Sequence, residues 1–223
     1  SFPFGEVDRV RGFAWADFDL DGDPDAVLLD GRGALHAFEN RQGGRFEVLP
    51  APGLVGVLGL TVGDLDADGR IDLVSLDAEG VISRSALGDS GWQSKEVASW
   101  PVSWDQILAG SHRILLADLD NNGALDLLGS GPRGTEIWLA NERARFAMLS
   151  TDIAAEIFGV LDVDGDGWLD LVGLDTGAPV QLRGRGTADY GWQEIYPRAH
   201  VAAGGQRINA FGVGGEIEVR AGL

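Results

Sequence analysis

The chain has 223 residues, of which 44% are hydrophobic and 34 are glycine, so it is long enough for one domain with a real core and many tight turns. Its formal net charge of −18 argues against nucleic acids and anionic membrane surfaces as partners. The sequence has no cysteine, which excludes disulfides and thiolate metal sites. It also has no run of about 20 apolar residues, which is the length that a membrane-spanning helix needs.

The first predicted strands flank a segment rich in aspartate. An apolar run at 13–16 precedes the segment 17–25, which has the sequence DFDLDGDPD, and a second apolar run follows at 26–29. The same order returns three times, with acidic segments at 64–72, 118–126 and 162–170, apolar runs before them at 60–63, 114–117 and 158–161, and apolar runs after them at 73–76, 127–130 and 171–174. Short apolar runs bounded by turn residues predict strands that are buried on both faces.

Two further strands are predicted after each of these pairs. One is amphipathic, as at 35–38 and 136–139, and the last is led by an aromatic residue, at 45–48, 92–95, 145–148 and 192–195. Four strands in about 45 residues are typical of a β-propeller blade. We therefore predict an all-β propeller of four-stranded blades, with units at about 11–49, 58–97, 112–149 and 156–196.

The acidic segments share the pattern D-x-D-x-[DN]-G-x-x-D, which predicts a calcium loop between the first two strands of each blade. The glycine at position 6 permits a sharp turn, so that side chains from positions 1, 3, 5 and 9 and the carbonyl of position 7 converge. The expected ligands are Asp17, Asp19, Asp21, Asp23 and Asp25; Asp64, Asp66, Asp68, Arg70 and Asp72; Asp118, Asp120, Asn122, Ala124 and Asp126; and Asp162, Asp164, Asp166, Trp168 and Asp170. Oxygen donors with several carboxylates suit Ca²⁺, whereas zinc prefers histidine or cysteine and magnesium a tighter octahedron.

The four predicted sites differ in charge. Sites one, two and four each place four carboxylates at positions 1, 3, 5 and 9, and site three places only three, because Asn122 stands at position 5. On charge count alone site three is expected to bind calcium most weakly. Four bound Ca²⁺ ions would reduce the excess negative charge, from a formal net charge of −18 to one of −10. An EF-hand is not expected, since its loop ends in a glutamate at position 12 and lies between helices.

These loops, with the apolar strand that follows each of them, resemble the FG-GAP or VCBS repeats of integrin-type β-propellers over about residues 11–196. The resemblance implies a propeller over 1–204 whose calcium loops join the first two strands of each blade. The segment 207–222, RINAFGVGGEIEVRAG, resembles the opening of an ASPIC/UnbV domain. Residues 205–223 are therefore expected to be either closing strands or the truncated start of such a domain.

The expected function is a non-catalytic, calcium-stabilised scaffold that presents loops to a protein or carbohydrate partner, outside the cell, at its surface or in the periplasm. Trp100 and Trp104 lie in the longest insertion between repeats, where they are candidates either for ligand binding or for packing over a blade edge. Two alternatives stay open. The propeller could be the body of a polysaccharide lyase or hydrolase, or the module could serve only to assemble with other domains.

Overall fold

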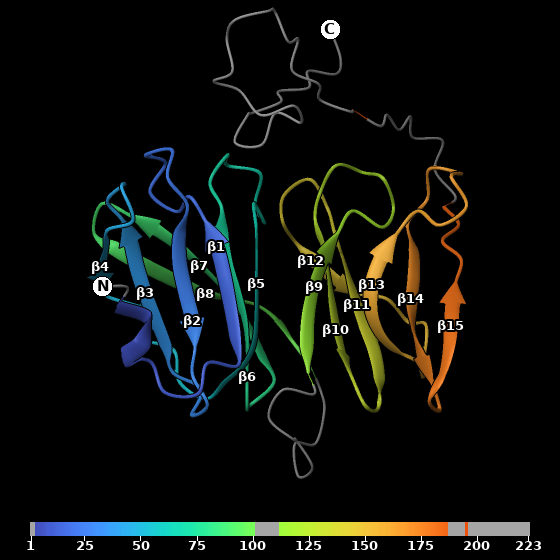
Figure 1. Cartoon of the computed structure of the whole chain (residues 1–223). Helices are drawn as coiled ribbons and strands as arrows, with labels where there is room; N and C mark the ends of the chain where they lie inside the picture. Colours follow the sequence, from blue (N-terminus) through green and yellow to red (C-terminus); the bar gives the residue numbers. More distant parts are fainter. Residues whose placement is uncertain (1–2, 101–111, 187–194, 196–223) are drawn as a thin grey trace, which may run out of the picture. The chain divides into compact units, whose positions relative to one another are not determined.

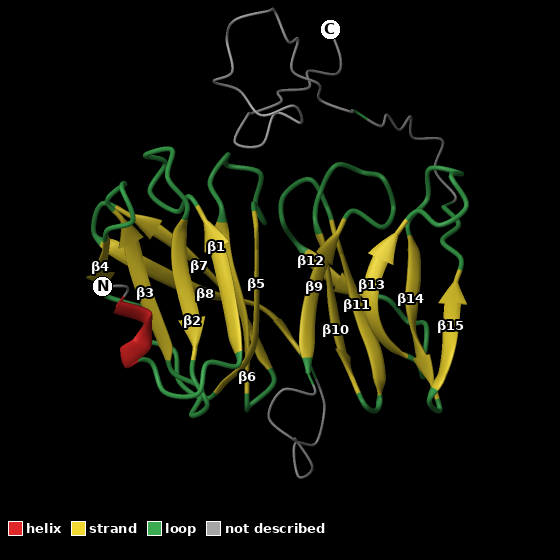
Figure 2. Cartoon of the chain, in the orientation of Figure 1, coloured by secondary structure: helices red, strands yellow, loops and turns green. Residues whose placement is uncertain are grey.

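The computed structural model describes residues 3–100, 112–186 and 195 (Figure 1). The chain divides into two compact units, Ser1–Tyr190 and Gly191–Leu223, and every described strand belongs to the first. Figure 2 shows that the described part consists of strands and loops apart from one short 3-10 helix, η1 (Pro3–Glu6). Within the described residues, no helix has the length and apolar character that crossing a membrane requires.

The strands form four antiparallel sheets, and each sheet is a meander in which strands that are consecutive in the chain pair with one another. The first sheet contains β1 (Gly12–Ala16), β2 (Asp25–Leu29), β3 (Leu35–Asn40) and β4 (Phe46–Leu49); the second β5 (Val57–Gly63), β6 (Asp72–Asp77), β7 (Val81–Gly88) and β8 (Gly91–Ser99); the third β9 (Arg113–Ala117), β10 (Asp126–Gly131), β11 (Gly134–Ala140) and β12 (Phe146–Met148); the fourth β13 (Glu156–Leu161), β14 (Asp170–Asp175) and β15 (Ala178–Leu182).

The prediction of four strands in each unit is confirmed for the first three repeats, and the structure shows that these strands pair antiparallel. The fourth sheet has three strands among the described residues. Its expected last strand, at 192–195, lies outside them except for Ile195, which is not in a strand. The segment 205–223, with its expected closing strands or ASPIC/UnbV start, also lies outside the described residues.

The second strand of a sheet contributes side chains to two hydrophobic clusters, since successive residues of a strand point to opposite faces of the sheet. On β6, Leu73 packs into a cluster with residues of the first sheet, and the next residue, Val74, packs into a cluster with residues of the third. On β10, Leu127 belongs to the same cluster as Val74, and Leu128 belongs to a cluster shared with the fourth sheet. Sheets stacked on both sides therefore explain why these strands are apolar without alternation.

The prediction that the first strand of each sheet is also buried on both faces was wrong. On β1, the side chains of Phe13 and Trp15 are 63% and 44% exposed, and on β13 Phe158 is 49% exposed. These strands are the outermost of their sheets in pairing order, so only part of their surface is covered by a neighbour. The ring of Trp15 packs instead edge-on against Phe4 and Phe46.

Candidate metal centres

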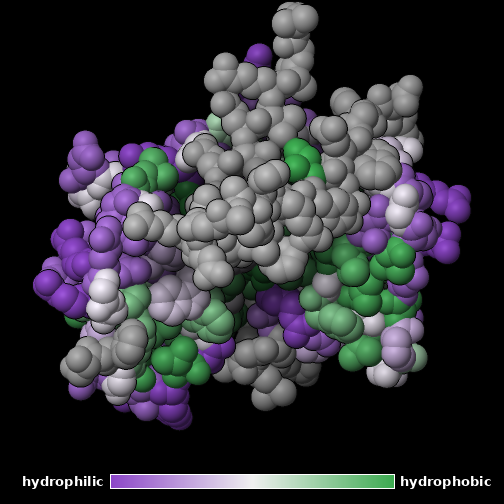
Figure 3. Space-filling model, turned by 45° about the horizontal axis from the view of Figure 1, so that its top comes forward, coloured by the Kyte–Doolittle hydropathy of each residue, from purple (hydrophilic) through white to green (hydrophobic). Residues whose placement is uncertain are grey.

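The four acidic loops join the first strand of each sheet to the second, and in Figure 1 they lie along one edge of the sheets, the upper edge in that view. The first strands also contact one another in order, β1 with β5, β5 with β9 and β9 with β13, so the loops that follow them are neighbours. Figure 3 turns this edge toward the viewer and shows hydrophilic residues on both sides, with a hydrophobic group on the right. The loops, which are rich in aspartate, thus follow one another along the same edge of the sheets.

The aspartate at position 1 organises each loop around itself. In the first loop, the Asp17 carboxylate accepts hydrogen bonds from the backbone N–H groups of Asp21 and Gly22, at 3.1 and 2.9 Å. Asp64, Asp118 and Asp162 accept the equivalent pair of bonds in their loops. The position-6 glycines, Gly22, Gly69, Gly123 and Gly167, have φ between 83° and 91°, which confirms the predicted turn.

A second left-handed residue in each loop was missed by the sequence analysis. Position 4 has a positive φ in all four loops: 64° at Leu20, 56° at Ala67, 57° at Asn121 and 75° at Gly165. Only glycine and, to a lesser degree, asparagine adopt this conformation readily. The available signal was the asparagine and glycine at this position of loops three and four, but the leucine and alanine of the other two obscured it.

The oxygen at position 5 closes a small turn onto position 7. Asp21 Oδ1 accepts the N–H of Asp23 at 2.9 Å, and the amide oxygen of Asn122 accepts the N–H of Ala124 at 2.7 Å. Asp68 and Asp166 make the same bond with the N–H groups of Arg70 and Trp168. Asn122 therefore makes the same turn as the aspartates at this position, but it has no charge, and its amide group donates to the carbonyl oxygen of Ala140 at 2.8 Å.

The closing aspartates, Asp25, Asp72, Asp126 and Asp170, are at most 1% exposed. Each accepts the N–H of the residue at position 2 of its own loop, at 2.8 to 3.3 Å. Asp25 and Asp126 also accept an N–H from the end of the third strand, from Asn40 at 2.9 Å and from Ala140 at 2.7 Å. These carboxylates thus tie both ends of the loop to the sheet.

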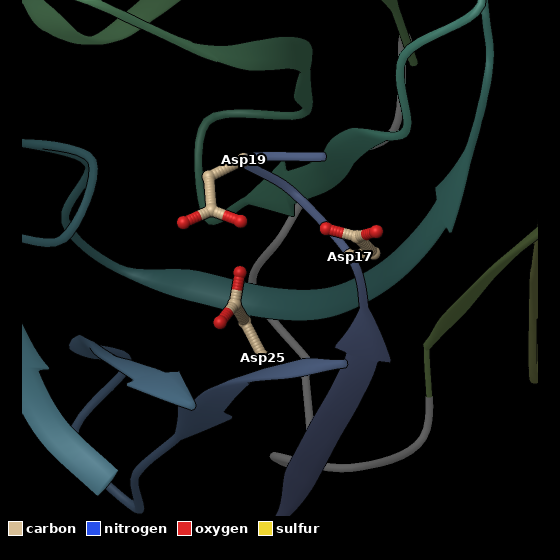
Figure 4. A group of neighbouring side chains, drawn as sticks. All are labelled: Asp17, Asp19 and Asp25. Carbon is tan, nitrogen blue, oxygen red and sulfur yellow. The ribbon is translucent and has the colours of Figure 1, made fainter. Parts of the chain in front are cut away.

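Three carboxylates converge in each loop, with their closest oxygens within 4.8 Å of one another. The groups are Asp17, Asp19 and Asp25; Asp64, Asp66 and Asp72; Asp118, Asp120 and Asp126; and Asp162, Asp164 and Asp166. Figure 4 shows the first group, in which the carboxylates of Asp17, Asp19 and Asp25 face a common centre.

The structure does not bring all the predicted ligands into these groups. Asp21 and Asp68 stay outside the carboxylate groups of the first two loops, as Asp170 does in the fourth. The Asp170 carboxylate instead accepts bonds from the Gln181 side chain and from the N–H of Gly184, each at 2.9 Å. The predicted carbonyl ligands at Asp23, Arg70, Ala124 and Trp168 stay a prediction.

The electrostatics of the loops favour a bound cation. Burial raises the pKa of Asp25 to about 6, and it raises the pKa of Asp126 to about 6 as well, with the neighbouring loop aspartates adding to the effect. Burial also raises the pKa of Asp120. In the fourth loop, by contrast, the hydrogen bond from Gly184 lowers the pKa of Asp170.

Three carboxylate oxygens of the loops, Asp23 Oδ2, Asp66 Oδ1 and Asp72 Oδ1, are buried without a hydrogen-bond partner. Buried oxygens of this kind are costly unless a donor or a cation satisfies them. The donor set of each cluster consists of oxygen only, which fits a hard cation such as Ca²⁺.

Of the two tryptophans proposed for ligand binding, the structure describes only Trp100. Trp100 is 5% exposed, and its ring lies edge-on to Trp138 with their centroids 6.4 Å apart. This burial favours the packing role that the sequence left open. Trp104 lies outside the described residues.

Comparison with known proteins agrees with the loop geometry. The sequence model of the FG-GAP-like repeat matches residues 17–75. The matched segment begins at Asp17 and covers the first two acidic loops. No curated protein matches the sequence. The likeness of 207–222 to an ASPIC/UnbV domain stays a prediction.

The fold is similar to that of a lectin from Agrocybe aegerita, whose structure concerns the specific recognition of non-reducing terminal N-acetylglucosamine. The two share 22% sequence identity with a TM-score of 0.51, over 74% of this chain and 47% of the lectin. The chain thus spans about half the length of that protein, and the likeness at this identity concerns the fold alone. With the FG-GAP-like repeat, it supports the predicted β-propeller architecture.

Proposed function

We propose that the chain is a calcium-stabilised, non-catalytic propeller scaffold that binds a carbohydrate or protein partner at or outside the cell surface. The observation that carries the calcium part is the arrangement of three carboxylates around a common centre in each of the four loops. In the first three loops the third carboxylate is a buried aspartate at the start of the second strand. A bound ion would supply positive charge where these carboxylates otherwise repel one another.

Calcium titration of metal-free protein tests this proposal. We expect calcium to bind and to raise the melting temperature, because a ligand that binds only the folded state stabilises it by about 2.7 kcal/mol per site at a hundredfold excess over its dissociation constant. Magnesium at the same concentration should stabilise less, since it demands a tighter octahedron. The proposal fails if metal-free protein binds no calcium at millimolar concentration and melts at the same temperature with and without a chelator.

A matched pair of variants locates the effect. Asp120 lies in the third cluster, whereas Asp152 lies in the connection between β12 and β13 and is in none of the four clusters. We expect Asp120→Asn to remove or weaken one calcium site and Asp152→Asn to leave calcium binding unchanged. Equal effects from both variants would mean that the binding reflects overall acidity and not the loops.

The partner is proposed to be a carbohydrate, with a protein as the alternative, because the similar fold belongs to a lectin. Glycans ending in N-acetylglucosamine, with galactose-ended glycans as the control, are the first ligands to test on an array. Retention of a glycan without product supports a binding scaffold, whereas release of shortened sugars would favour the lyase or hydrolase alternative. Binding to no glycan would direct the search to protein partners.

The proposed location outside the cell follows from calcium supply. Extracellular calcium is millimolar, so it would fill sites in the weaker part of the range that protein calcium sites cover. Dissociation constants measured for the four loops test this point. Values all in the submicromolar range would remove the reason to expect an extracellular setting.

A further inference from the structure

The second loop holds a positive side chain among its own carboxylates. Arg84 of β7 forms ion pairs with three aspartates of this loop: its Nε lies 2.7 Å from Asp72 Oδ2, its Nη2 lies 3.6 Å from Asp68 Oδ2, and its Nη1 contacts Asp66 Oδ2. The Arg84 side chain is only 19% exposed, and that of Asp72 is fully buried. The guanidinium group therefore lies within the cluster and not on the solvent side of it.

The other sheets place no such cation at this position. In antiparallel register Arg84 faces Val74, which lies two residues after the closing aspartate. The residues in the same register elsewhere are Ala37, Ile137 and Gln181. In the fourth loop Arg183 pairs with Asp164 at 2.9 Å, but its side chain is 60% exposed. Among the described residues, only the second loop has an arginine that contacts its closing aspartate.

Arg84 occupies oxygens that a bound ion would also need. It engages one oxygen of Asp66 and one of Asp72, both of which belong to the cluster of the second loop. The other oxygens of the same two carboxylates, Asp66 Oδ1 and Asp72 Oδ1, are buried without a hydrogen-bond partner. A cation is thus already present at the centre, and the Asp64 carboxylate and the second oxygens of Asp66 and Asp72 remain for another one.

We propose that Arg84 is a fixed internal cation of the second loop, which holds this loop closed without calcium and makes it the weakest of the four calcium sites. The inference rests on the proposed function, because it ranks sites that calcium must first occupy. It also revises the order of calcium affinities expected from the number of carboxylates, in which site three was the weakest. Loop three has three carboxylates, whereas loop two has four carboxylates with Arg70 of its own and Arg84 of β7, so loop two is the less negative of the two. Only in loop two does the positive charge compete directly for ligand oxygens.

The test compares Arg84→Met with Lys95→Met in the full chain. Lys95 faces Arg84 across the β7–β8 pair and is exposed, so its replacement removes the same charge from the same sheet. Calcium binding is measured by titration of metal-free protein with calcium alone, and melting is followed in EDTA and in calcium. We expect one site of Arg84→Met to tighten by at least about tenfold, because a positive charge within ion-pair distance is removed. Lys95→Met should leave all affinities within about twofold, since exposed charges are screened.

The melting curves supply an independent readout. In EDTA, Arg84→Met should melt at a lower temperature than the parent protein, and calcium should restore more stability to it than to the parent. Arg84→Lys, which keeps a positive charge but lacks the planar fork, should fall between the two. If Arg84→Met does not fold in EDTA, refolding on addition of calcium supports the proposal, and failure to refold contradicts it.

Two outcomes separate this inference from the proposed function. If the parent protein binds calcium but Arg84→Met leaves every affinity unchanged, or loses a site, the inference is overturned and the proposed function stands. If neither protein binds calcium, both fail. In that case a lower melting temperature of Arg84→Met in EDTA would show only that the ion pairs stabilise the fold.

Discussion

The folding stability of the metal-free protein should fall as the pH rises from about 4 to above 6, which is the reverse of the usual behaviour of buried, hydrogen-bonded carboxylates. The groups responsible are Asp25 and Asp126, whose pKa values burial raises from 3.8 to about 6. A carboxyl whose pKa is higher in the folded than in the unfolded state binds its proton more tightly when folded. Its contribution to stability is complete below the unfolded-state pKa and is lost as the pH rises through the folded-state pKa.

The size of the effect follows from the two shifts. Each is about 2 pKa units, and one unit corresponds to about 1.4 kcal/mol, so each aspartate accounts for a loss on the order of 3 kcal/mol. Both side chains are at most 1% exposed, so solvent screens the effect little. The pKa of Asp30, lowered to about 2 by hydrogen bonds from Ala34 and His36, changes stability only below the same window.

Urea unfolding of metal-free protein, followed by tryptophan fluorescence, measures this dependence at about pH 4.5 and about pH 7.5. We expect a free energy of unfolding several kcal/mol lower at the higher pH. Asp126→Asn should reduce the difference by the contribution of Asp126, on the order of 3 kcal/mol, because that position then no longer titrates. With saturating calcium the trend should reverse, because protons compete with the ion for the same oxygens. Metal-free protein that is equally or more stable at the higher pH would refute the reasoning.

Three further predictions concern stability, and unfolding measurements check each. Leu20→Gly should stabilise the chain by about 1 kcal/mol, because Leu20 is 51% exposed and has a φ of 64°; destabilisation would contradict the strain argument. Leu128→Ala should cost about 2–5 kcal/mol, since Leu128 is fully buried between the third and fourth sheets, whereas Met148→Ala, at a position 45% exposed, should cost less than about 1 kcal/mol. Gly129→Ala should cost about 1–3 kcal/mol, because the new Cβ would lie 2.8 Å from Cε3 of Trp100; a cost that stays the same in a Trp100→Ala background would show that the two residues are not coupled.

The repeated loops and the strands around them were predictable because they depend on local rules. Glycine adopts a positive φ with the least strain, and the structure has that conformation at Gly22 and its three equivalents. A second strand without alternation, such as the run containing Leu73 and Val74, predicts burial on both faces, and the two residues do pack into different clusters. The same rule failed for Phe13, whose strand has the composition of a buried one but lies first in its sheet.

The balance of charge within each site depended on contacts that no local pattern contains. Nothing in an amphipathic strand distinguishes Arg84 from an ordinary surface residue, and its reach into the loop follows from the register of β7 on β6. Likewise, the fourth loop differs from the other three because its closing aspartate, Asp170, accepts hydrogen bonds from Gln181 on β15 and from Gly184 just after that strand.

The sequence by itself thus determined where the chain turns, where strands alternate with loops, and which segments carry the candidate ligands. These properties follow from backbone dihedrals and from the spacing of residues within nine positions of one another. Only the tertiary structure decided how much charge each centre retains, whether its closing aspartate is desolvated, and that Trp100 is buried against Trp138. The reason is physical: desolvation and ion pairing are set by residues from neighbouring strands and sheets, whose side chains meet only after the chain has folded.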